Sequence, residues 1–313
     1  MTTLEGHAPA KLNLTLEVLG RRADGFHEIA SVMHTLRLGD ALTLELPPPE
    51  RLNPACGAIR CVEPTDTPLM HEAIPTDSSN LVWKAVAQFV GALRERGVSQ
   101  SVSPLAWRAT LLKRIPSQAG LGGGSSDAAC ALRLLNQWAA LHADALPDET
   151  LQAIASALGA DVAFFLRGGC AVAQGKGERL QPLPTLPAFW WVLAKPYGVG
   201  VPTGWAYAQL GRSAYTPATP APHTERLIRQ LPSLSTPHQL APLLHNDFDA
   251  PILQATPLLT QVRTVMEAGG ALRVILCGSG AAQAALCESA DHARTLAHTL
   301  RQQGWWAVAV QNG

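Results

Sequence analysis

Hydrophobic and polar residues alternate near the start of the chain, in residues 11–19 (KLNLTLEVL). Strict alternation is typical of a strand with one face buried and the other in solvent. Similar patterns predict strands at residues 29–38 and 41–46, with Gly39 and Asp40 forming the turn that joins them. The proline-rich residues 47–54 (PPPERLNP) are predicted to form a surface loop. The first part of the chain is therefore expected to be rich in strands.

Hydrophobic residues recur every three or four positions in much of the remaining chain, and this spacing predicts helices. We expect helices at residues 81–96, 125–141, 148–158, 160–166, 203–210, 258–268, 281–287 and 292–303. Ser79 or Asn80 is available to cap the first of them. Further strands are expected at residues 105–115, 170–173, 189–194, 272–276 and 305–310. The two kinds of element mix without a regular β-α-β rhythm, so the predicted fold class is α+β.

The chain is long enough for two domains, since it has 313 residues. The pattern of predicted elements changes after Gly168, where short strands and proline-rich loops replace the long helices. We therefore predict one domain over residues 1–170 and a second over residues 171–313.

Charge and cysteine content exclude several classes of protein. Lys plus Arg and Asp plus Glu both number 24, so no net charge attracts nucleic acid or an anionic membrane from a distance. No apolar run approaches the ~18 residues that cross a bilayer, and the N-terminus lacks the features of a signal peptide. The six cysteines are sparse, and Cys56 and Cys61 have no second pair to complete a zinc site. We therefore expect a cytoplasmic protein with reduced thiols and no protein-held metal.

Residues 116–129 (PSQAGLGGGSSDAA) join a predicted strand to a predicted helix through a glycine cluster. Four of the five positions from Gly120 to Gly124 are glycine, which is unfavourable unless the backbone needs unusual torsions or a close approach. The first N–H groups of a helix lack internal partners, and the helix dipole is positive there. A phosphate can therefore bind against this backbone, and Ser125 and Ser126 can cap the helix or offer hydroxyls. The alternative is a glycine-rich turn used for tight packing.

The two commonest phosphate-binding loops do not fit this stretch. The Walker pattern is approached only at Lys176, where Cys170 replaces the first glycine and Gly177 follows the lysine. The third glycine of the dinucleotide fingerprint would fall at Ser125. The stretch instead resembles the phosphate-binding motif of the GHMP kinases, the superfamily of galactokinase and of homoserine, mevalonate and phosphomevalonate kinases.

Other stretches extend this resemblance over nearly the whole chain. Residues 9–29 (PAKLNLTLEVLGRRADGFHEI), 158–180 (LGADVAFFLRGGCAVAQGKGERL) and 245–252 (HNDFDAPI) resemble the branch of the family that phosphorylates a diphosphocytidyl-linked polyol in non-mevalonate isoprenoid synthesis. Residues 276–282 (LCGSGAA) are similar to the family's third, glycine-rich motif. The resemblance implies a two-domain GHMP kinase fold, with a ribosomal-protein-like N-terminal domain and an α/β-plait C-terminal domain.

The resemblance also implies a reaction, the transfer of the γ-phosphoryl group of ATP to the 2-hydroxyl of the polyol. It maps the catalytic pair onto Lys11 and Asp161. Asp161 would accept the hydroxyl proton or orient the hydroxyl, and Lys11 would hold Asp161 and the acceptor and offset negative charge. Asn13 would share the strand face of Lys11 and contact the acceptor. Taken alone, Lys11 could be a solvated strand lysine and Asp161 a helix N-cap.

A cytidine site is implied by the same resemblance. His27 would hydrogen-bond the edge of the cytosine, while Phe26 would stack on one face of the ring and Tyr207 on the other. Thr203 would approach the substrate. Without the resemblance, Phe26 could be a core aromatic, His27 a turn histidine and Tyr207 a helix-packing residue.

For ATP, the resemblance implies adenine contacts from Asn80, Leu81 and Lys113, although a surface strand lysine is an even alternative for Lys113. The phosphate loop would comprise Ala119, Gly120, Leu121, Gly122, Gly123, Gly124, Ser125 and Ser126. A second backbone clamp would comprise Gly278, Ser279 and Gly280. Mg²⁺ is expected as a cofactor, held mainly by water and ATP because the sequence has no obvious carboxylate cluster.

Two positions depart from the family pattern. Gln118 stands where many of the phosphate loops have glycine, ahead of the tightest part of the loop, and is expected to be tolerated. Ala282 stands where threonine is common after the third motif, so one hydroxyl contact to a phosphate is expected to be missing.

Other functions remain open on the sequence. The nearest is a GHMP kinase acting on a different small alcohol, and the Phe26–His27 pair argues against it because a cytidine pocket needs that pair. An RNA-binding module is disfavoured by the zero net charge. A catalytically inactive small-molecule sensor is disfavoured because Lys11 and Asp161 are both present. The expected partner is a small molecule, and the oligomeric state is left open.

Overall fold

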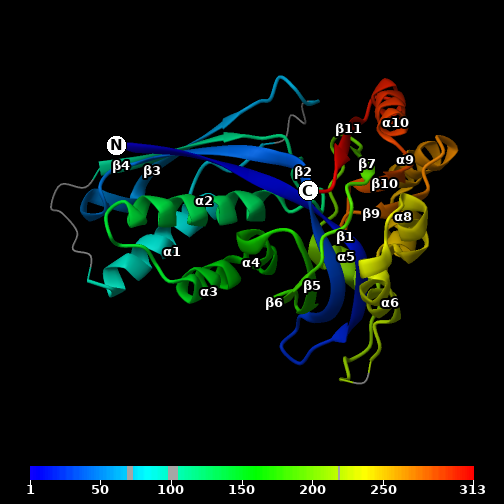
Figure 1. Cartoon of the computed structure of the whole chain (residues 1–313), viewed down its shortest axis with the longest axis horizontal. Helices are drawn as coiled ribbons and strands as arrows, with labels where there is room; N and C mark the ends of the chain where they lie inside the picture. The colour runs from blue at the N-terminus through cyan, green and yellow to red at the C-terminus, as the bar shows by residue number, and fades with distance from the viewer. Residues whose placement is uncertain (69–72, 98–104, 218) are drawn as a thin grey trace.

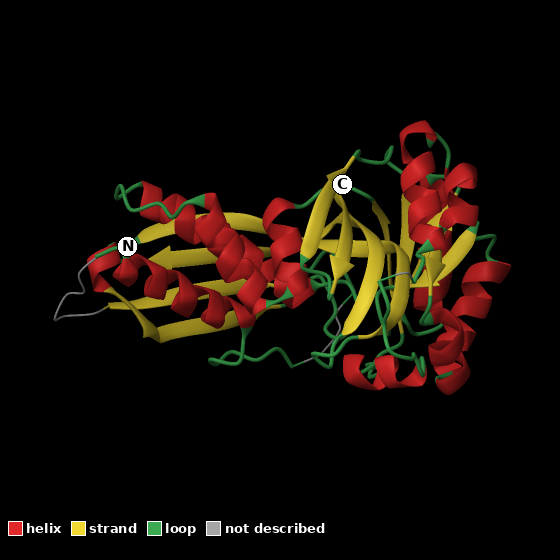
Figure 2. Ribbon diagram, turned by 90° about the horizontal axis from the view of Figure 1, so that it is seen from below, coloured by secondary structure: helices red, strands yellow, loops and turns green. Residues whose placement is uncertain are grey.

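The computed structural model describes residues 1–68, 73–97, 105–217 and 219–313. Two layered units lie side by side along the long axis of the molecule (Figure 1). One is a larger sheet with helices on one face, and the other is a smaller sheet with helices on its outer side. Figure 2 shows that long strands of the first unit run into the region between the two units. The predicted α+β class is confirmed.

The first sheet has seven strands among the described residues, in the order β3-β4-β2-β1-β8, with β5 attached to β2 and β6 to β5. The strands are β1 (Thr2–Arg21), β2 (His27–Leu46), β3 (Leu52–Val62), β4 (Leu105–Leu112), β5 (Cys170–Gly175), β6 (Arg179–Leu183) and β8 (His245–Asn246). Residues 47–54 were predicted to form a loop, but strand β3 begins within them, at Leu52. A 3-10 turn at Pro49–Arg51 precedes the strand. Because β5 and β6 follow residue 170, the first sheet extends beyond the predicted domain boundary.

Strands β1 and β2 form one long antiparallel hairpin. Its turn lies at Asp24 and Gly25, where the Asp24 carboxylate accepts the N–H of Phe26 and Gly25 has a φ of +87°. The predicted turn at Gly39 and Asp40 is wrong, because β2 runs through both residues. Asp40 is fully buried, and its carboxylate accepts the backbone N–H groups that follow β4, so a polar residue typical of turns is held inside the sheet.

Both faces of β1 are buried over the predicted segment, residues 11–19, which corrects the prediction of a half-solvated strand there. The leucines of its alternating segment pack against the second unit and its connecting helices. The polar residues of this segment are at most 4% exposed: Lys11, Asn13, Thr15 and Glu17. A row of polar side chains inside a protein needs hydrogen-bond partners. For β1, these partners lie around a cavity between the two units and in a helix on the side of the second unit.

Four helices cover one face of the first sheet (Figure 1). They are α1 (Leu81–Glu95), α2 (Gly123–Ala140), α3 (Asp148–Leu158) and α4 (Ala160–Arg167). All four were predicted from their hydrophobic spacing, and their ends agree with the prediction to within two residues. Their apolar faces enclose a core that includes Phe89, Trp107 and Trp138, each fully buried.

The second sheet is antiparallel, with strand order β11-β7-β10-β9. Its elements are β7 (Trp190–Lys195), β9 (Arg273–Leu276), β10 (Gln283–Cys287) and β11 (Trp306–Gln311), with α9 (Pro257–Ala268) and α10 (Ala290–Gln302) on its outer face. With the helices before β9 counted as one crossover, this is the β-α-β-β-α-β order of an α/β plait. Its inner face, including Trp191, shares a core with leucines of β1.

The helix predicted at residues 281–287 is wrong, because this segment contains β10. Its alanine-rich sequence (AAQAALC) carries no clear period, so local spacing could not separate helix from strand. Strand β10 is central and hydrogen-bonds to β7 on one side and β9 on the other. Small residues suit this position because α9 and the first unit cover its two faces.

Short helices connect the two sheets. They are α5 (Thr203–Gln209), α6 (Pro222–Gln230), α7 (Pro237–Leu240) and α8 (Asp249–Ala255). Only α5 was predicted from the sequence. None of the helices in the described ranges is both long enough and apolar enough to span a membrane.

Candidate active site

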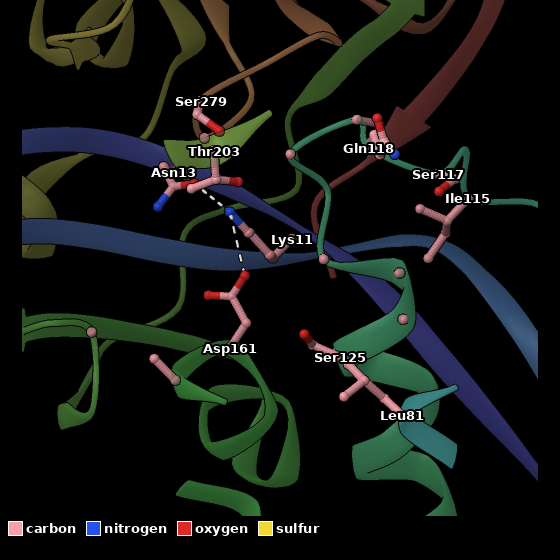
Figure 3. Close-up of a pocket in the computed structure, with 18 of the residues that line it drawn as sticks. Lys11, Asn13, Leu81, Ile115, Ser117, Gln118, Ser125, Asp161, Thr203 and Ser279 are labelled. Atoms are coloured by element: carbon pink, nitrogen blue, oxygen red, sulfur yellow. Dashed lines mark hydrogen bonds and ion pairs between the residues drawn. The ribbon is translucent and has the colours of Figure 1, made fainter. Parts of the chain in front are cut away.

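A cavity of about 540 Å³ lies where the two units meet. Its walls come from β1, the glycine loop before α2, the start of α4, helix α5 and the loop between β9 and β10. Figure 3 shows Lys11 and Asp161 facing each other across it, with Ser279 and Thr203 on one side and Ser125 on another. The cavity therefore brings together residues from both sheets.

The glycine loop approaches other backbone as closely as its sequence predicts. Gly120 and Gly122 have φ values of +73° and +76°, in the left-handed region that favours glycine. A Cβ on Gly120 would lie 1.7 Å from the Cys277 carbonyl oxygen. The loop is also fixed to β1, because the Lys11 N–H donates to the Leu121 carbonyl. The loop is thus held on both sides while its glycines line the cavity.

Helix α2 begins at Gly123, and its N-cap is Gly122. The serine caps expected from the sequence are therefore not formed. Ser125 lines the cavity, whereas Ser126 is fully buried and its hydroxyl has no hydrogen-bond partner in the described part of the chain. Of the two serines, only Ser125 presents a hydroxyl to the cavity. The N–H groups of the first turn that no helical carbonyl can accept are those of the glycines and Ser125, because the Ser126 N–H already donates to the Gly122 carbonyl.

The two residues expected to form the catalytic pair lie together. The Lys11 ammonium is 4.0 Å from the Asp161 carboxylate and donates to the Asn13 side-chain oxygen at 2.5 Å (Figure 3). The Lys11 side chain is 5% exposed, whereas that of Asp161 is 38% exposed. Asp161 lies in the first turn of α4, whose N-cap is Gly159, so the N-cap interpretation of Asp161 is wrong. The solvated interpretation of Lys11 is wrong as well.

The third glycine motif lies against the phosphate loop. Gly278 and Ser279 line the cavity, while Gly280 does not. The backbone N–H of Ala281 donates to Gln118, and that of Ala282 donates to Ala119. Ala282 is fully buried, so this position contributes backbone hydrogen bonds that need no hydroxyl.

Gln118 sits in a backbone conformation that favours glycine, with a φ of +47°. Its carbonyl is the acceptor for the third motif, so the strained residue lies at the junction of the two glycine loops. This geometry explains why glycine is common at this place in the GHMP pattern, since a side chain there has to tolerate the left-handed region.

The residues expected at the cytidine site are grouped near the hairpin turn. The rings of His27 and Tyr207 stack, with centroids 4.6 Å apart. Phe26 is 55% exposed, and the Lys176 ammonium lies 4.8 Å from the centre of its ring. Thr203 and Tyr207 line the cavity, whereas Phe26 and His27 lie outside its lining. The stacked pair of His27 and Tyr207 continues from the cavity edge, and together with Phe26, the residue before His27 in the chain, it makes up the aromatic patch.

Burial changes the protonation of this patch. Desolvation lowers the pKa of His27, and the nearby Arg21 lowers it further. Burial raises the pKa of Tyr207 to about 12. At neutral pH, His27 is therefore neutral and offers one donor and one acceptor, which suits the mixed edge of a nucleobase.

Asn80 and Leu81 line the cavity at the start of α1. The Asn80 side-chain oxygen accepts the Val82 N–H, so Asn80 is the N-cap of the helix. Its side-chain nitrogen donates to the Pro75 carbonyl. The amide is thus held at both ends, which fixes its orientation, and one proton of its nitrogen has no acceptor among the described residues and is left for a ligand.

Lys113 is buried, which excludes the surface-lysine alternative. Its ammonium contacts the carboxylates of Asp40 and Asp127 and lies at the cavity wall. Burial opposes its charge, but Asp127 and Asp40 together raise the pKa of Lys113 above its ordinary value. Burial raises the pKa of Asp127 to about 7, with Asp40 acting in the same direction and Lys113 opposing both.

Sequence reasoning missed several residues that hold the site together. Asp40 was interpreted as a turn residue, and the role of Asp127 was left open. Asn246, on β8, donates to the Leu276 and Gly278 carbonyls and so fixes the third glycine motif. No local signal identifies these contacts, since the partners lie 14 to 75 residues away, although Asn246 itself falls in the stretch 245–252 that carried the resemblance.

Cys56 is exposed, Cys61 is partly buried, and all six cysteines are free thiols. Within the described ranges, no group of three or more His, Cys, Asp or Glu side chains is arranged to hold a metal ion.

Comparison with known proteins agrees with this geometry. Residues 80–169 match the GHMP kinases N terminal domain family. The chain is 35% identical to the 4-diphosphocytidyl-2-C-methyl-D-erythritol kinase of Gloeobacter violaceus, covering 96% of this chain and 91% of the relative. It is 34% identical to the enzyme of that name from Citrifermentans bemidjiense, covering 99% of both.

Solved structures give the same result. A crystal structure of 4-(cytidine 5'-diphospho)-2C-methyl-D-erythritol kinase matches with a TM-score of 0.72 at 34% identity, over 99% of both chains. A homoserine kinase from Cytophaga hutchinsonii matches with a TM-score of 0.68 at 17% identity, covering all of this chain and 95% of the other, and so shares the fold.

The fold and the glycine-loop site therefore define a GHMP-type small-molecule kinase. Within that class, the chain belongs to the 4-diphosphocytidyl-2-C-methyl-D-erythritol kinase family.

Proposed function

We propose that this protein transfers the γ-phosphoryl group of ATP to the 2-hydroxyl of 4-diphosphocytidyl-2-C-methyl-D-erythritol. The observation that carries the proposal is the cavity in which Lys11 and Asp161 face the glycine-lined start of helix α2. Family membership supports the substrate, because the relatives at 34–35% identity bear that enzyme's name.

The phosphates of ATP would bind to the loop from Ala119 to Ser126. The unpaired N–H groups and the positive end of the α2 dipole favour an anion there. We assign direct contact to the backbone of the glycines and to the Ser125 hydroxyl. The side chains of Leu121 and Ser126 are fully buried and the Ser126 N–H donates to the Gly122 carbonyl, so we assign these two residues a role in the shape of the loop. Gly278 and Ser279 would close the other side as a backbone clamp, and Gly280, which lies outside the cavity lining, would support their turn through its N–H bond to the Cys277 carbonyl.

In the transfer, the acceptor oxygen forms a bond to the γ-phosphorus while the bond from that phosphorus to the β–γ bridging oxygen breaks. ADP leaves, and the hydroxyl proton passes to Asp161 and then to solvent. Lys11 holds Asp161 and the acceptor oxygen and offsets the negative charge of the phosphoryl group. Asn13 lies beside Lys11 in the cavity and would also contact the acceptor.

The cytidine end of the substrate would lie on the aromatic patch. Phe26 and Tyr207 would stack on the cytosine and neutral His27 would hydrogen-bond its edge, with Thr203 contacting the polyol side. In the structure, His27 already stacks on Tyr207. His27 would therefore have to move away from Tyr207 before a cytosine could stack on the Tyr207 ring.

The adenine end would lie between the start of α1 and the end of β4, against Asn80, Leu81 and Lys113. All three line the same wall of the cavity. Because the Lys113 ammonium is already bound to two carboxylates, we assign it an indirect role through the shape and charge of this wall.

We propose Mg²⁺ as the cofactor, bound mainly through ATP oxygens and water. Mg²⁺ prefers oxygen ligands and keeps several waters, and the Ser125 hydroxyl is the protein oxygen on the phosphate side that suits it. When bound, it would neutralise charge on the phosphate oxygens. The donor set fits a nucleotide-borne ion better than an ion held by the protein alone.

Two further assignments accompany this proposal. We place the domain boundary in the segment after β6, near residues 184–189, instead of at residue 170, because β5 and β6 pair within the first sheet. We also propose a cytoplasmic location, supported by the free thiols.

One assay tests the function. The protein is incubated with Mg-ATP and, separately, 4-diphosphocytidyl-2-C-methyl-D-erythritol, mevalonate, homoserine or galactose, and ADP release is measured. Turnover is expected only with the first acceptor. Turnover with a non-cytidine alcohol alone would refute the substrate assignment, and no turnover with any acceptor would refute the kinase activity.

A further inference from the structure

A buried row of hydrogen bonds runs from the catalytic lysine into β2. The Lys11 ammonium donates to the Asn13 side-chain oxygen at 2.5 Å, and the Asn13 side-chain nitrogen donates to the Ser31 hydroxyl at 2.8 Å. The Ser31 hydroxyl donates to the Thr15 backbone carbonyl at 2.6 Å. Ser31 is 0% exposed and Asn13 is 4% exposed, so water does not compete for these bonds.

Each bond in this row has only one possible direction. A carbonyl oxygen can only accept, so the single proton of Ser31 is directed at Thr15. Ser31 can then only accept from Asn13, which places the amide nitrogen of Asn13 toward Ser31 and its oxygen toward Lys11. An ammonium can only donate, so this amide orientation is the one that holds Lys11.

The row lies at an irregularity of the hairpin. The register between β1 and β2 shifts between Asn13 and Thr15. Such shifts commonly re-aim side chains next to active sites. Here the Ser31 hydroxyl donates to the Thr15 carbonyl at the shift. Ser31 also accepts from the Asn13 amide and so fixes the orientation of the amide that faces Lys11.

We infer that Ser31 is a positioning residue for the phosphoryl transfer: it fixes the orientation of the Asn13 amide, and through it the Lys11 ammonium. The inference rests on the proposed function, in which Lys11 acts on the acceptor. Ser31 touches neither substrate, because it does not line the cavity. Its loss should therefore weaken the chemical step more than nucleotide binding.

The test compares three variants. Ser31→Ala removes the acceptor for Asn13, Ser31→Thr keeps a hydroxyl, and Thr224→Val is the matched control. The Thr224 hydroxyl is also buried and bonds to the Thr15 hydroxyl at 2.9 Å, but it does not reach Asn13. Steady-state kcat and the KM for ATP are measured with whichever acceptor the unmodified protein turns over, and thermal unfolding is measured in parallel.

Ser31→Ala is expected to lower kcat about tenfold to a hundredfold, since a misplaced catalytic group costs about that much, while the KM for ATP stays within twofold. Ser31→Thr should recover at least a third of kcat. Thr224→Val should keep kcat within twofold even if it unfolds at a lower temperature. The inference is overturned if Ser31→Ala keeps more than half of kcat, if Thr224→Val falls as far, or if a folded Ser31→Thr is as slow as Ser31→Ala.

A readout on the free protein separates this inference from the proposed function. The side-chain amide protons of Asn13, observed by NMR with selective ¹⁵N-asparagine labelling, should shift and exchange faster in Ser31→Ala and remain unchanged in Thr224→Val. This measurement needs no acceptor. Unchanged Asn13 signals in Ser31→Ala would overturn the positioning role even in an active kinase. Altered signals in a protein that turns over no acceptor would place the failure in the proposed function.

Discussion

The structure gives Lys113 a role that differs from both the adenine contact and the surface lysine that the sequence allowed. Its ammonium contacts Asp40 from β2 and Asp127 from the first turn of α2, with 12% of the side chain exposed. Two carboxylates and one ammonium leave one excess negative charge in a nearly closed space. Burying such a charge is unfavourable unless a proton neutralises it. The cluster should therefore respond to pH.

We predict that Asp127→Asn changes the pH dependence of stability. The pKa of Asp127 is raised from 3.8 to about 7 in the folded protein, so between these values the folded state keeps a proton that the unfolded chain releases. Stability from this group is therefore lost as the pH rises from about 4 to about 7. The free energy of unfolding of the unmodified protein, relative to that of Asp127→Asn, should fall over this range in urea titrations.

The neighbours of this cluster do not obscure the result. Besides Asp40 and Lys113, the titratable groups facing it are the thiols of Cys61 and Cys130, whose pKa values burial raises, and the imidazole of His7, which interacts with Asp40 and whose pKa burial lowers. The two thiols stay protonated throughout the range. His7 is present in both proteins, so the comparison with Asp127→Asn removes its own titration. A difference between the two proteins that stays constant from pH 4 to pH 7 would contradict the raised pKa of Asp127.

Asp161 carries the second prediction at this scale. Asp161→Asn keeps the shape of the side chain but removes its ability to take a proton, so kcat should fall about 10²- to 10⁴-fold. The KM for ATP should change little, because the phosphate loop is untouched. Asp148→Asn is the matched control, since Asp148 is an exposed aspartate in the first turn of the neighbouring helix α3. Near-normal turnover by Asp161→Asn would remove this residue from the mechanism.

At the scale of elements, local signals predicted the helices around the site better than the strands. The hydrophobic spacing of α1 to α4 and the glycine cluster before α2 are properties of short segments, so the sequence alone could indicate them. Strand β10 and the continuity of β2 depend on partners far along the chain. Asp40 is inside a strand only because the segment after β4 supplies its hydrogen bonds.

The same difference applies to the site residues. Lys11, Asp161 and the glycine loop were found because a known motif carries them. Ser31 and Asp40 belong to no motif that the sequence showed, and Asn246 lies in the stretch 245–252 without an assigned role. The contacts of all three exist only after folding. Sequence reasoning therefore brought together residues that line one cavity, and missed residues whose hydrogen bonds hold that cavity's walls.

The glycine loop is an element whose backbone geometry can be tested directly. In Gly120→Ala, the added Cβ would meet the Cys277 carbonyl, and the left-handed φ of +73° would disfavour alanine by about 1–2 kcal/mol. We expect a lower free energy of unfolding and at least a tenfold rise in the KM for ATP, because the loop must move to relieve the clash.

Gly91→Ala is the control for this substitution. Gly91 lies inside α1, and a Cβ there would meet nothing within 4 Å. Alanine should stabilise the helix by about 0.5–1 kcal/mol and leave the KM for ATP unchanged. Urea unfolding and steady-state kinetics check both variants. An unchanged KM in Gly120→Ala would show that phosphate binding does not depend on the close approach of the two glycine loops.

At the scale of the whole molecule, the site depends on how two sheets are joined. The phosphate loop of the first unit accepts hydrogen bonds from the third glycine motif of the second unit, at Gln118 and Ala119. Asn246 reinforces this junction, because its side chain donates to the Leu276 and Gly278 carbonyls from β8, a strand of the first sheet. A ligand on the phosphate loop should therefore also stabilise the backbone of the second unit.

Hydrogen exchange measures this coupling. A non-hydrolysable ATP analogue with Mg²⁺ should slow amide exchange in peptides covering residues 117–126 and also in those covering residues 276–282. Asn246→Ala should keep the first protection and lose most of the second, because the clamp on Gly278 is gone. Asn136→Ala is the control, since Asn136 makes a similar two-bond clamp on Leu146, within the first unit and away from the junction. Equal loss of protection in both variants would mean that Asn246 stabilises the fold in general. If the ligand protects only residues 117–126 in the unmodified protein, the two glycine loops are not coupled by ligand binding.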